Sequence, residues 1–376
     1  MIKKLFLLTG LVLLLNVWGF SQDDEGGYNP VFSVVWDFYS KNNPGARVWG
    51  MGGAGVANVN DLTAMVTNPA AFDLNKRFNF YSEFTSKSDI KFLKENDYCL
   101  KSPDILPDFI GFGFKVNDRL KIGLGYSSPK YHKLDFGVIF RTDPFSPEPT
   151  DTIHLYYIFQ SKQGILVVNY NFQEVVFFGA NLNYNFLSYG LFENSDKVYG
   201  LDVEYLNLKF GVLAKMYKLF GFKEKDIKFD LGFVYTPKKR IETEDYYKKT
   251  TYPAQLKIGF RIYNIPLPLS FAGDIKFSQN SQAKDLEDRW DIHLGCEWVA
   301  TENLAFQFGY FTRFDYRTQE GIWTGDDEDW DQHFLTTGMR FSYDRYLFQI
   351  SVRDSHLLSS GFIKTTQLSL GGGVGF

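Results

Sequence analysis

Apolar and polar side chains alternate along most of the chain beyond about residue 75. Between Val175 and Phe186, apolar side chains occupy every even position, and Gly or Asn occupies most of the odd ones. Successive side chains of a β-strand point to opposite faces, so each alternating segment reads as a strand with one apolar and one polar face. Such strands build either a soluble sandwich or barrel with apolar faces inside, or a membrane barrel with apolar faces in lipid.

Strand length and loop length favour the membrane barrel. The segments run for about 9 to 13 residues, enough to cross a bilayer at a tilt, whereas strands average about 5 to 6 residues in soluble proteins. Short turns are expected at 117–118, 171, 264–265, 300–303 and 344. Long loops are expected between them at 188–203, 237–250, 278–289, 315–333 and 355–363. Short turns on one side and long loops on the other are typical of bacterial barrels, so the sequence predicts an all-β, antiparallel transmembrane β-barrel.

The number of strands has two readings. Fourteen wall strands are expected at 77–86, 108–116, 119–127, 163–172, 174–187, 204–216, 226–236, 252–263, 266–277, 290–299, 303–314, 334–343, 345–354 and 364–376. Two further alternating segments, 133–141 and 152–160, are either a hairpin that projects from an outer loop or two more wall strands. Fourteen is the preferred count and sixteen the alternative; both are even, as in bacterial barrels.

The first residues carry an export signal. Lys3 and Lys4 precede a short apolar run from Leu5 to Leu15, and small residues follow near Ser21. This pattern predicts a cleaved signal peptide over residues 1–21, with the barrel over 76–376 in a bacterial outer membrane. The formal charge of −4 gives no basic excess for nucleic acid, and two cysteines cannot form a disulfide scaffold.

Residues 22–75 do not alternate and are rich in glycine. Gly50, Gly52 and Gly53 lie in one run, and Asn68-Pro69-Ala70 follows. A phosphate-binding loop is excluded, because no strand precedes the glycines and no Lys-Ser/Thr follows them. A barrel of fourteen strands encloses more space than its own side chains fill. The segment is therefore expected to fold as a compact plug in the lumen.

At these residues the chain resembles a known group. The Gly45-Ala46-Arg47 sequence, the run from Gly50 to Ala57 and Asn68-Pro69-Ala70 are similar to the start of the FadL/TodX superfamily, which includes PorV/PorQ-type relatives. The resemblance implies a fourteen-stranded barrel with an N-terminal hatch. It implies passive uptake of small hydrophobic compounds, fatty-acid-like or aromatic, with a lateral exit and without enzymatic activity or a cofactor. The alternative is a PorV-like accessory role in protein secretion, with secreted proteins or a translocon as partners.

Two further sites are expected. Gly123, Gly125 and Pro129 end one strand with residues that bend a strand or cannot donate to its ladder, so they are the candidate kink for a lateral opening. A plain strand end is the competing interpretation. The terminal Phe376 resembles the signal by which the barrel assembly machinery recognises its substrates.

The sequence contains no recognised motif for catalysis or for metal binding. The five histidines lie in separate segments, and His293, beside Asp291, is expected to be a hydrated lumen residue. The acidic run 326–331 has no recognised cation-ligand spacing and is expected to be a solvated loop. The loop with Tyr246-Tyr247 among basic residues has two interpretations, contact with anionic lipopolysaccharide or an ordinary charged loop, of which the charged loop is preferred. Outer-membrane lipid and lipopolysaccharide are expected partners of the barrel.

Overall fold

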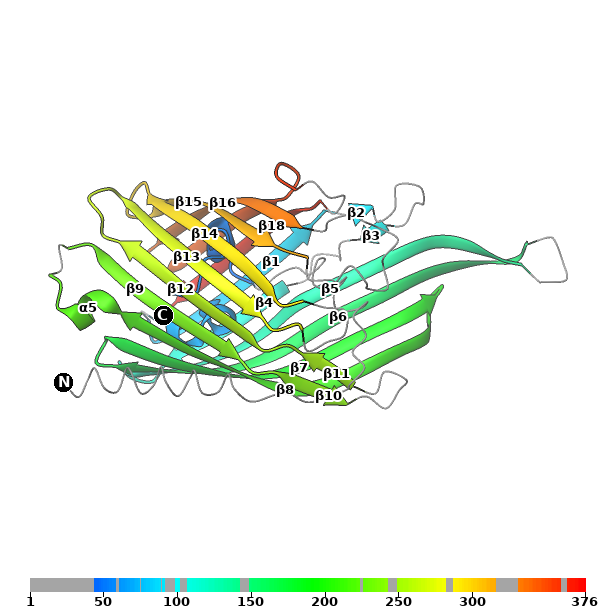
Figure 1. The fold of residues 1–376 in the computed structure, drawn as a ribbon, viewed down its shortest axis with the longest axis horizontal. Coiled ribbons are helices and arrows are strands. Elements are labelled where there is room, and N and C mark those ends of the chain that lie inside the picture. The colour runs from blue at the N-terminus through cyan, green and yellow to red at the C-terminus, as the bar shows by residue number, and fades with distance from the viewer. Residues whose placement is uncertain are drawn as a thin grey trace.

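Fourteen strands form a closed antiparallel ring in the computed structural model (Figure 1). The structure describes residues 44–58, 61–74, 76–88, 90–91, 99–101, 107–142, 149–223, 226–242, 249–281, 287–315, 331–359 and 364–376. The wall strands are β1 (Phe78–Lys87), β4 (Pro107–Lys115), β5 (Leu120–Thr142), β6 (Pro149–Phe172), β7 (Val176–Glu193), β8 (Asp196–Lys215), β9 (Lys228–Thr236), β12 (Gln255–Tyr263), β13 (Leu269–Ser278), β14 (Arg289–Val299), β15 (Leu304–Arg313), β16 (Gln332–Tyr343), β17 (Tyr346–Asp354) and β18 (Thr366–Gly375).

Shorter elements complete the described chain. They are β2 (Ile90–Lys91), β3 (Cys99–Lys101), the hairpin β10 (Lys239–Glu242) and β11 (Lys249–Tyr252), and the helices α3 (Ala46–Gly50), α4 (Ala64–Thr67), η2 (Pro69–Ala71) and α5 (Met216–Phe220). In the described ranges no helix combines the length and apolar character needed to cross a bilayer.

The first and last strands close the ring. Strand β1 pairs with both β4 and β18, and the backbone N–H of Phe376 donates to the carbonyl of Phe78 at 2.8 Å. The predicted count of fourteen is confirmed. The alternative of sixteen is wrong, because 133–141 and 152–160 are outward continuations of β5 and β6 that remain paired with each other.

One expected loop is also wrong. Residues 188–203 do not form a long loop, because β7 and β8 stay paired out to Glu193 and Asp196 and are joined by a tight turn at Asn194. Asn194 has a φ of 55°, a left-handed conformation that asparagine tolerates better than most residues. Figure 1 shows the result: β5 to β8 run well past the ends of the other strands.

The two faces of the wall differ as expected for a barrel in lipid. Large apolar side chains such as Leu124, Ile258 and Phe308 are between 51 and 60% exposed on the outer face. The neighbouring lumen-facing Gln307 and Asn169 are fully buried. An apolar exterior around a polar interior is the arrangement of a transmembrane barrel.

Described residues 44–74, termed here the inner segment, lie inside the ring (blue in Figure 1). Helix α3 lies against β15 to β18, and η2 lies against β6, β7 and β8 on the other side of the lumen. The segment is largely buried and carries most of an apolar cluster that includes Met65, Phe72 and Phe109. The inner segment therefore contacts the wall on both sides of the lumen, through α3 and through η2.

Candidate functional site

Glycines in the wall give the inner segment room to touch the strands. A Cβ at Gly309 would lie 2.1 Å from the backbone nitrogen of Gly52, and one at Gly179 would lie 2.1 Å from the carbonyl carbon of Pro69. A similarly close approach to the inner segment recurs at Gly211, Gly232 and Gly295, whereas at Gly259 and Gly338 the nearest atom belongs to a wall side chain, Asp274 or Gln307, and the inner segment comes next. The inner segment thus packs directly against the backbone of these lumen-facing glycines.

The glycines of the inner segment have a matching role. Gly52 and Gly53 have φ of 65° and 79°, which most other residues adopt only with strain. A Cβ at Gly52 would lie 2.3 Å from the carbonyl oxygen of Leu294 in β14. Gly50 packs against Gly338 of β16.

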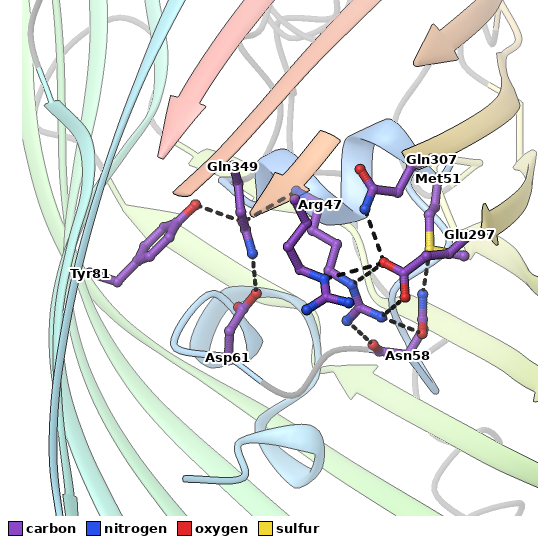
Figure 2. A network of polar contacts seen from close by, with 9 residues as sticks. Arg47, Met51, Asn58, Asp61, Tyr81, Glu297, Gln307 and Gln349 are labelled. Carbon is purple, nitrogen blue, oxygen red and sulfur yellow. Dashed lines mark hydrogen bonds and ion pairs between the residues drawn. The ribbon is translucent and has the colours of Figure 1, made fainter. Parts of the chain in front are cut away.

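A buried ion pair ties the inner segment to β14 (Figure 2). The guanidinium of Arg47 donates to both carboxylate oxygens of Glu297, at 2.8 and 2.9 Å, and to the carbonyl of Asn58 at 2.9 Å. Gln307 donates to the same carboxylate at 3.0 Å. Burial lowers the pKa of Arg47, but the adjacent Glu297 carboxylate outweighs burial and holds that pKa above its usual value. The carboxylate of Glu297 thus compensates the burial of the Arg47 guanidinium.

A second polar cluster holds the start of the inner segment against β1 and β17. The carboxylate of Glu83 accepts hydrogen bonds from the backbone N–H groups of Gly45 and Ala46, at 2.8 to 3.0 Å. The hydroxyl of Tyr81 lies 2.9 Å from Glu83 and 3.0 Å from Gln349. Figure 2 shows Gln349 between Tyr81 and Asp61. Glu83, Tyr81 and Gln349 are buried and Asp61 is partly buried, so their hydrogen bonds offset the cost of leaving water.

Further contacts bind the middle of the inner segment. The carboxylate of Asp274 accepts the N–H groups of Gly55 and Val56, at 2.7 and 2.9 Å. The hydroxyl of Thr336 accepts a hydrogen bond from the N–H of Gly52 and donates one to the carbonyl of Gly50, each at 3.0 Å. Nδ1 of His293 donates to the carbonyl of Gly52 at 2.8 Å. His293 is thus a hydrogen-bonding partner of the inner segment.

The Asn68-Pro69-Ala70 sequence forms a capped turn. The side chain of Asn68 accepts the N–H of Ala70 at 3.0 Å and donates to the carbonyl of Val56 at 2.6 Å. Asn is a favoured N-cap, and Pro69 stands at the first helical position, where its missing N–H costs nothing. Asn169 of β6 donates to the carbonyl of Ala70 at 2.8 Å. Local capping thus sets the turn, and the contact with Asn169 sets its position on the wall.

At β5 the glycines face apolar side chains. A Cβ at Gly123 would lie 2.3 Å from Met65 and 2.7 Å from Phe72. Gly123 and Gly125 themselves lie in regular ladder pairs with β4 and β6. The irregularity comes just beyond them: two residues, Ser128 and Pro129, oppose a single residue of β6, which is a β-bulge.

A cavity of about 250 Å³ lies beside the inner segment. Its lining includes Trp49 and Val56 of that segment, His293 and Phe311 of the wall, and Pro129 of the bulge. Four cationic side chains and two carboxylates also face it. The cavity is therefore amphipathic, with aromatic and charged walls.

Other sequence expectations have no structural counterpart to report. Residues 1–21, residues 22–43 of the expected plug, Tyr246-Tyr247 and the acidic residues 326–330 lie outside the described part of the chain. Within that part, no group of three or more His, Cys, Asp or Glu could hold a metal ion, and Cys296 is free. The Arg47–Glu297 pair and the cations of the cavity were missed, because their partners are far apart in the sequence.

Comparisons with known proteins agree on the fold. No family model and no curated protein matches the chain. Among solved structures, it is similar to the Ralstonia pickettii toluene transporter TbuX, with a TM-score of 0.66 and 14% identity over 89% of this chain and 99% of that one. It is also similar to the P. putida toluene transporter TodX, with a TM-score of 0.64 and 12% identity over 89% of this chain and 99% of that one.

A Pseudomonas aeruginosa FadL homologue gives a TM-score of 0.60 at 13% identity, covering 90% of this chain and 98% of that one. These matches span nearly the whole of both chains, but the identities show the architecture alone. The chain therefore has the FadL-like fold of these transporters.

Proposed function

We propose that this protein is an outer-membrane channel for the passive uptake of small hydrophobic compounds, with the inner segment as a movable hatch. The observation that carries the proposal is the cavity. One wall of it is the hatch, at Trp49 and Val56, and another is Pro129, in the bulge of β5. A compound in this cavity would touch both the inner segment and one of the three register shifts of the β5–β6 ladder, the one at Ser128 and Pro129.

The exit is proposed at β5. Gly123 and Gly125 leave the lumen face of the wall without side chains, and Met65 and Phe72 of the hatch fill that space. Withdrawal of these two side chains would leave an apolar gap against the strands. A bulge weakens the ladder locally. Of the three register shifts between β5 and β6, the one at Ser128 and Pro129 is nearest in sequence to Gly123 and Gly125, so the strands are proposed to separate there.

Uptake needs no energy source in this scheme. Burial of an apolar compound is favourable by on the order of 25 cal/mol for each Å² of its apolar surface that is removed from water. The compound then leaves through the wall into the lipid. The similar structures named above include toluene transporters, and a further one is a monoaromatic hydrocarbon channel. The cavity and these similar structures point to a compact aromatic or acyl compound as the cargo.

The test is influx of labelled toluene into vesicles whose outer leaflet is lipopolysaccharide, with and without the purified protein. Influx should rise with the protein. Deletion of Pro129 removes the extra residue of the bulge and should lower influx several-fold, while Pro129→Ala keeps the residue count and should retain most of it. Equal influx with and without protein would refute the channel; full influx after the deletion would refute this exit.

A second candidate function is that of an accessory in protein secretion. It is favoured by β5 to β8, which have 18 to 24 residues each and project past the rest of the barrel. Such a projection offers a surface to another protein. Capture of envelope proteins by the full barrel, but not by one whose β5–β6 hairpin is shortened to the height of its neighbours, would support this role. We further propose that Phe376 directs assembly by the barrel assembly machinery, since it ends the strand that closes the ring.

A further inference from the structure

Strand β8 has a partner on only one side over much of its length. It pairs with β7 from Asp196 to Ala214, but its pairing with β9 begins only at Phe210, opposite Tyr235. Among the described residues no other strand pairs with the stretch 196–209. This stretch, termed here the free edge, belongs to the strands that project past the rest of the barrel (Figure 1).

The direction of the backbone groups shows which residues of β8 face the free side. The N–H of Lys215 donates to the carbonyl of Val175 at the start of β7, and the carbonyl of Tyr205 accepts a hydrogen bond from Asn185 of β7. Backbone groups alternate in direction along a strand. The odd-numbered residues of β8 therefore point their N–H and carbonyl groups to β7, and the even-numbered residues from 202 to 208 point theirs to the free side.

The sequence explains why β9 leaves β8. Phe210 is opposite Tyr235, so the residue that would face Leu208 is Pro237. Proline has no N–H to donate to a neighbouring strand. The ladder stops there, and the hairpin that follows pairs β10 only with β11.

The two edges of the projecting strands differ. On the edge formed by β5, strand β3 of the same chain pairs with residues 133–135. On the edge formed by β8, the nearby hairpin touches a face of the strand instead: the rings of Tyr205 and Tyr252 stack with centroids 5.1 Å apart. Unpaired backbone groups on an edge are a template for another strand, so the free edge of β8 is open to strand addition.

The outer side chains along the free edge define which strand fits. Leu206 and Leu208 are 52 and 44% exposed, and unpaired backbone groups beside lipid-facing side chains are costly. Glu204 accepts a hydrogen bond from the hydroxyl of Tyr184 and has no cationic partner within the described chain. Opposite charges on directly opposed residues stabilise a strand pair. A fitting strand therefore has a basic residue opposite Glu204 and apolar residues opposite the leucines.

We propose that the free edge of β8 takes up an extended segment of another protein as an added antiparallel strand, which is basic at one end and apolar at the other. Main-chain hydrogen bonds would supply the affinity, and alternate side chains the specificity. The inference rests on the second candidate function, since it names how another protein is held. It involves neither the hatch nor the cavity.

The probe is a fluorescent synthetic octapeptide with threonine at every odd position and lysine, lysine, leucine, leucine at the even ones. Its binding to the purified full-length protein in detergent is followed by anisotropy. In the proposed pairing the lysine and leucine N–H groups donate to β8 and the threonine N–H groups point away. N-methylation of the lysines and leucines should weaken binding at least about tenfold, whereas N-methylation of the threonines should leave it unchanged.

A matched pair of variants tests the protein side. Asp202→Pro removes an N–H on the free side, at an edge position where proline is tolerated, and should weaken binding at least about tenfold. Asp202→Ala loses the same contacts with Ser188 and Lys197 but keeps the N–H, and should retain most of the binding. Hydrogen exchange of the amides at 202–208 should be fast in the free protein and slow with the peptide.

No binding of the unmodified peptide, or equal binding of the two methylated peptides, would overturn the proposal. Slow exchange at 202–208 in the free protein would overturn it too, because the chain's own segment would then cover the edge. A dimer that Asp202→Pro dissociates would assign the edge to a second copy and refute the choice of partner.

Capture of envelope proteins by the full barrel is the separate measure of the second candidate function. If proteins are captured but the peptide does not bind, strand addition is refuted and that function stands. If the peptide binds as expected but no protein is captured, the free edge stands as a strand acceptor and the secretion role is refuted.

Discussion

The Arg47–Glu297 ion pair allows a quantitative test of how firmly the hatch is held. Arg47 is 5% exposed and Glu297 is 2% exposed, so Arg47→Met leaves a carboxylate buried in the lumen. Removing one partner of a buried pair costs about 3 to 5 kcal/mol. Gln307 remains 3.0 Å from Glu297 and Arg340 remains 3.6 Å away. We therefore expect a cost at the low end, about 3 kcal/mol.

This cost should appear as opening of the hatch and leave the barrel intact. The hatch is bound separately by Asp274, Thr336 and Glu83, whereas the wall is held by its own strand ladders. A loss of about 3 kcal/mol raises the open population by about a hundredfold. Hydrogen exchange followed by mass spectrometry should show that acceleration for peptides covering 44–58.

The matched controls make the result specific. Lys218→Met breaks an exposed pair with Glu174 near the short-turn end and should leave exchange of the hatch unchanged. Adding Glu297→Gln to Arg47→Met removes the unpaired charge and should recover part of the protection. Unchanged exchange at 44–58 in Arg47→Met, or equal acceleration in the strands of the wall, would refute the reasoning.

Three further predictions follow from the packing and closure of the barrel. Gly309→Ala places a methyl 2.1 Å from Gly52 and should lower the free energy of unfolding by about 1 to 3 kcal/mol in chemical denaturation. Gly164→Ala, whose nearest neighbour is 3.9 Å away, should be neutral. Equal denaturation midpoints for the two variants would contradict the close packing of the inner segment on the wall glycines. Asp274→Ala removes the single carboxylate oxygen, Oδ2, that accepts the N–H groups of both Gly55 and Val56, and should speed amide exchange at 55–56 about tenfold or more, with no change in strand β18. Deletion of Phe376 should lower the yield of folded barrel in outer membranes, measured by its heat-dependent gel mobility; an unchanged yield would argue against a role in assembly.

The period-two pattern was enough to predict the wall, but it failed where the environment changes. Beyond the bilayer the outer face of a strand no longer needs to be apolar, so alternation fades although the ladder continues. That is why 188–203 read as a loop, while β7 and β8 in fact extend to Glu193 and Asp196. The bulge at Ser128 and Pro129 has a similar effect, because one extra residue reverses the alternation and separates 119–127 from 133–141.

The hatch shows a different limit. Its glycines and its Asn68-Pro69 turn could be recognised locally, since backbone conformation and capping depend on neighbours in sequence. Its partners could not, because Arg47 and Glu297 are 250 residues apart. The pairing of Lys257 with Lys276 depends likewise on the register between two strands. Which charged side chains lie together in the lumen can therefore be predicted only when the register of the strands is known.

The most direct test of the account is whether a locked hatch stops transport. A Cβ at Gly50 would lie 3.0 Å from the Cβ of Gln307, so a disulfide between Gly50→Cys and Gln307→Cys needs a small outward shift to reach the usual Cβ separation of about 3.8 Å. The pair is made with Cys99 and Cys296 replaced by Ser, and each single cysteine variant is the control. Toluene influx into vesicles should be lost when the disulfide forms and should return on reduction. Equal influx in the oxidised and reduced states would show that the hatch does not have to move.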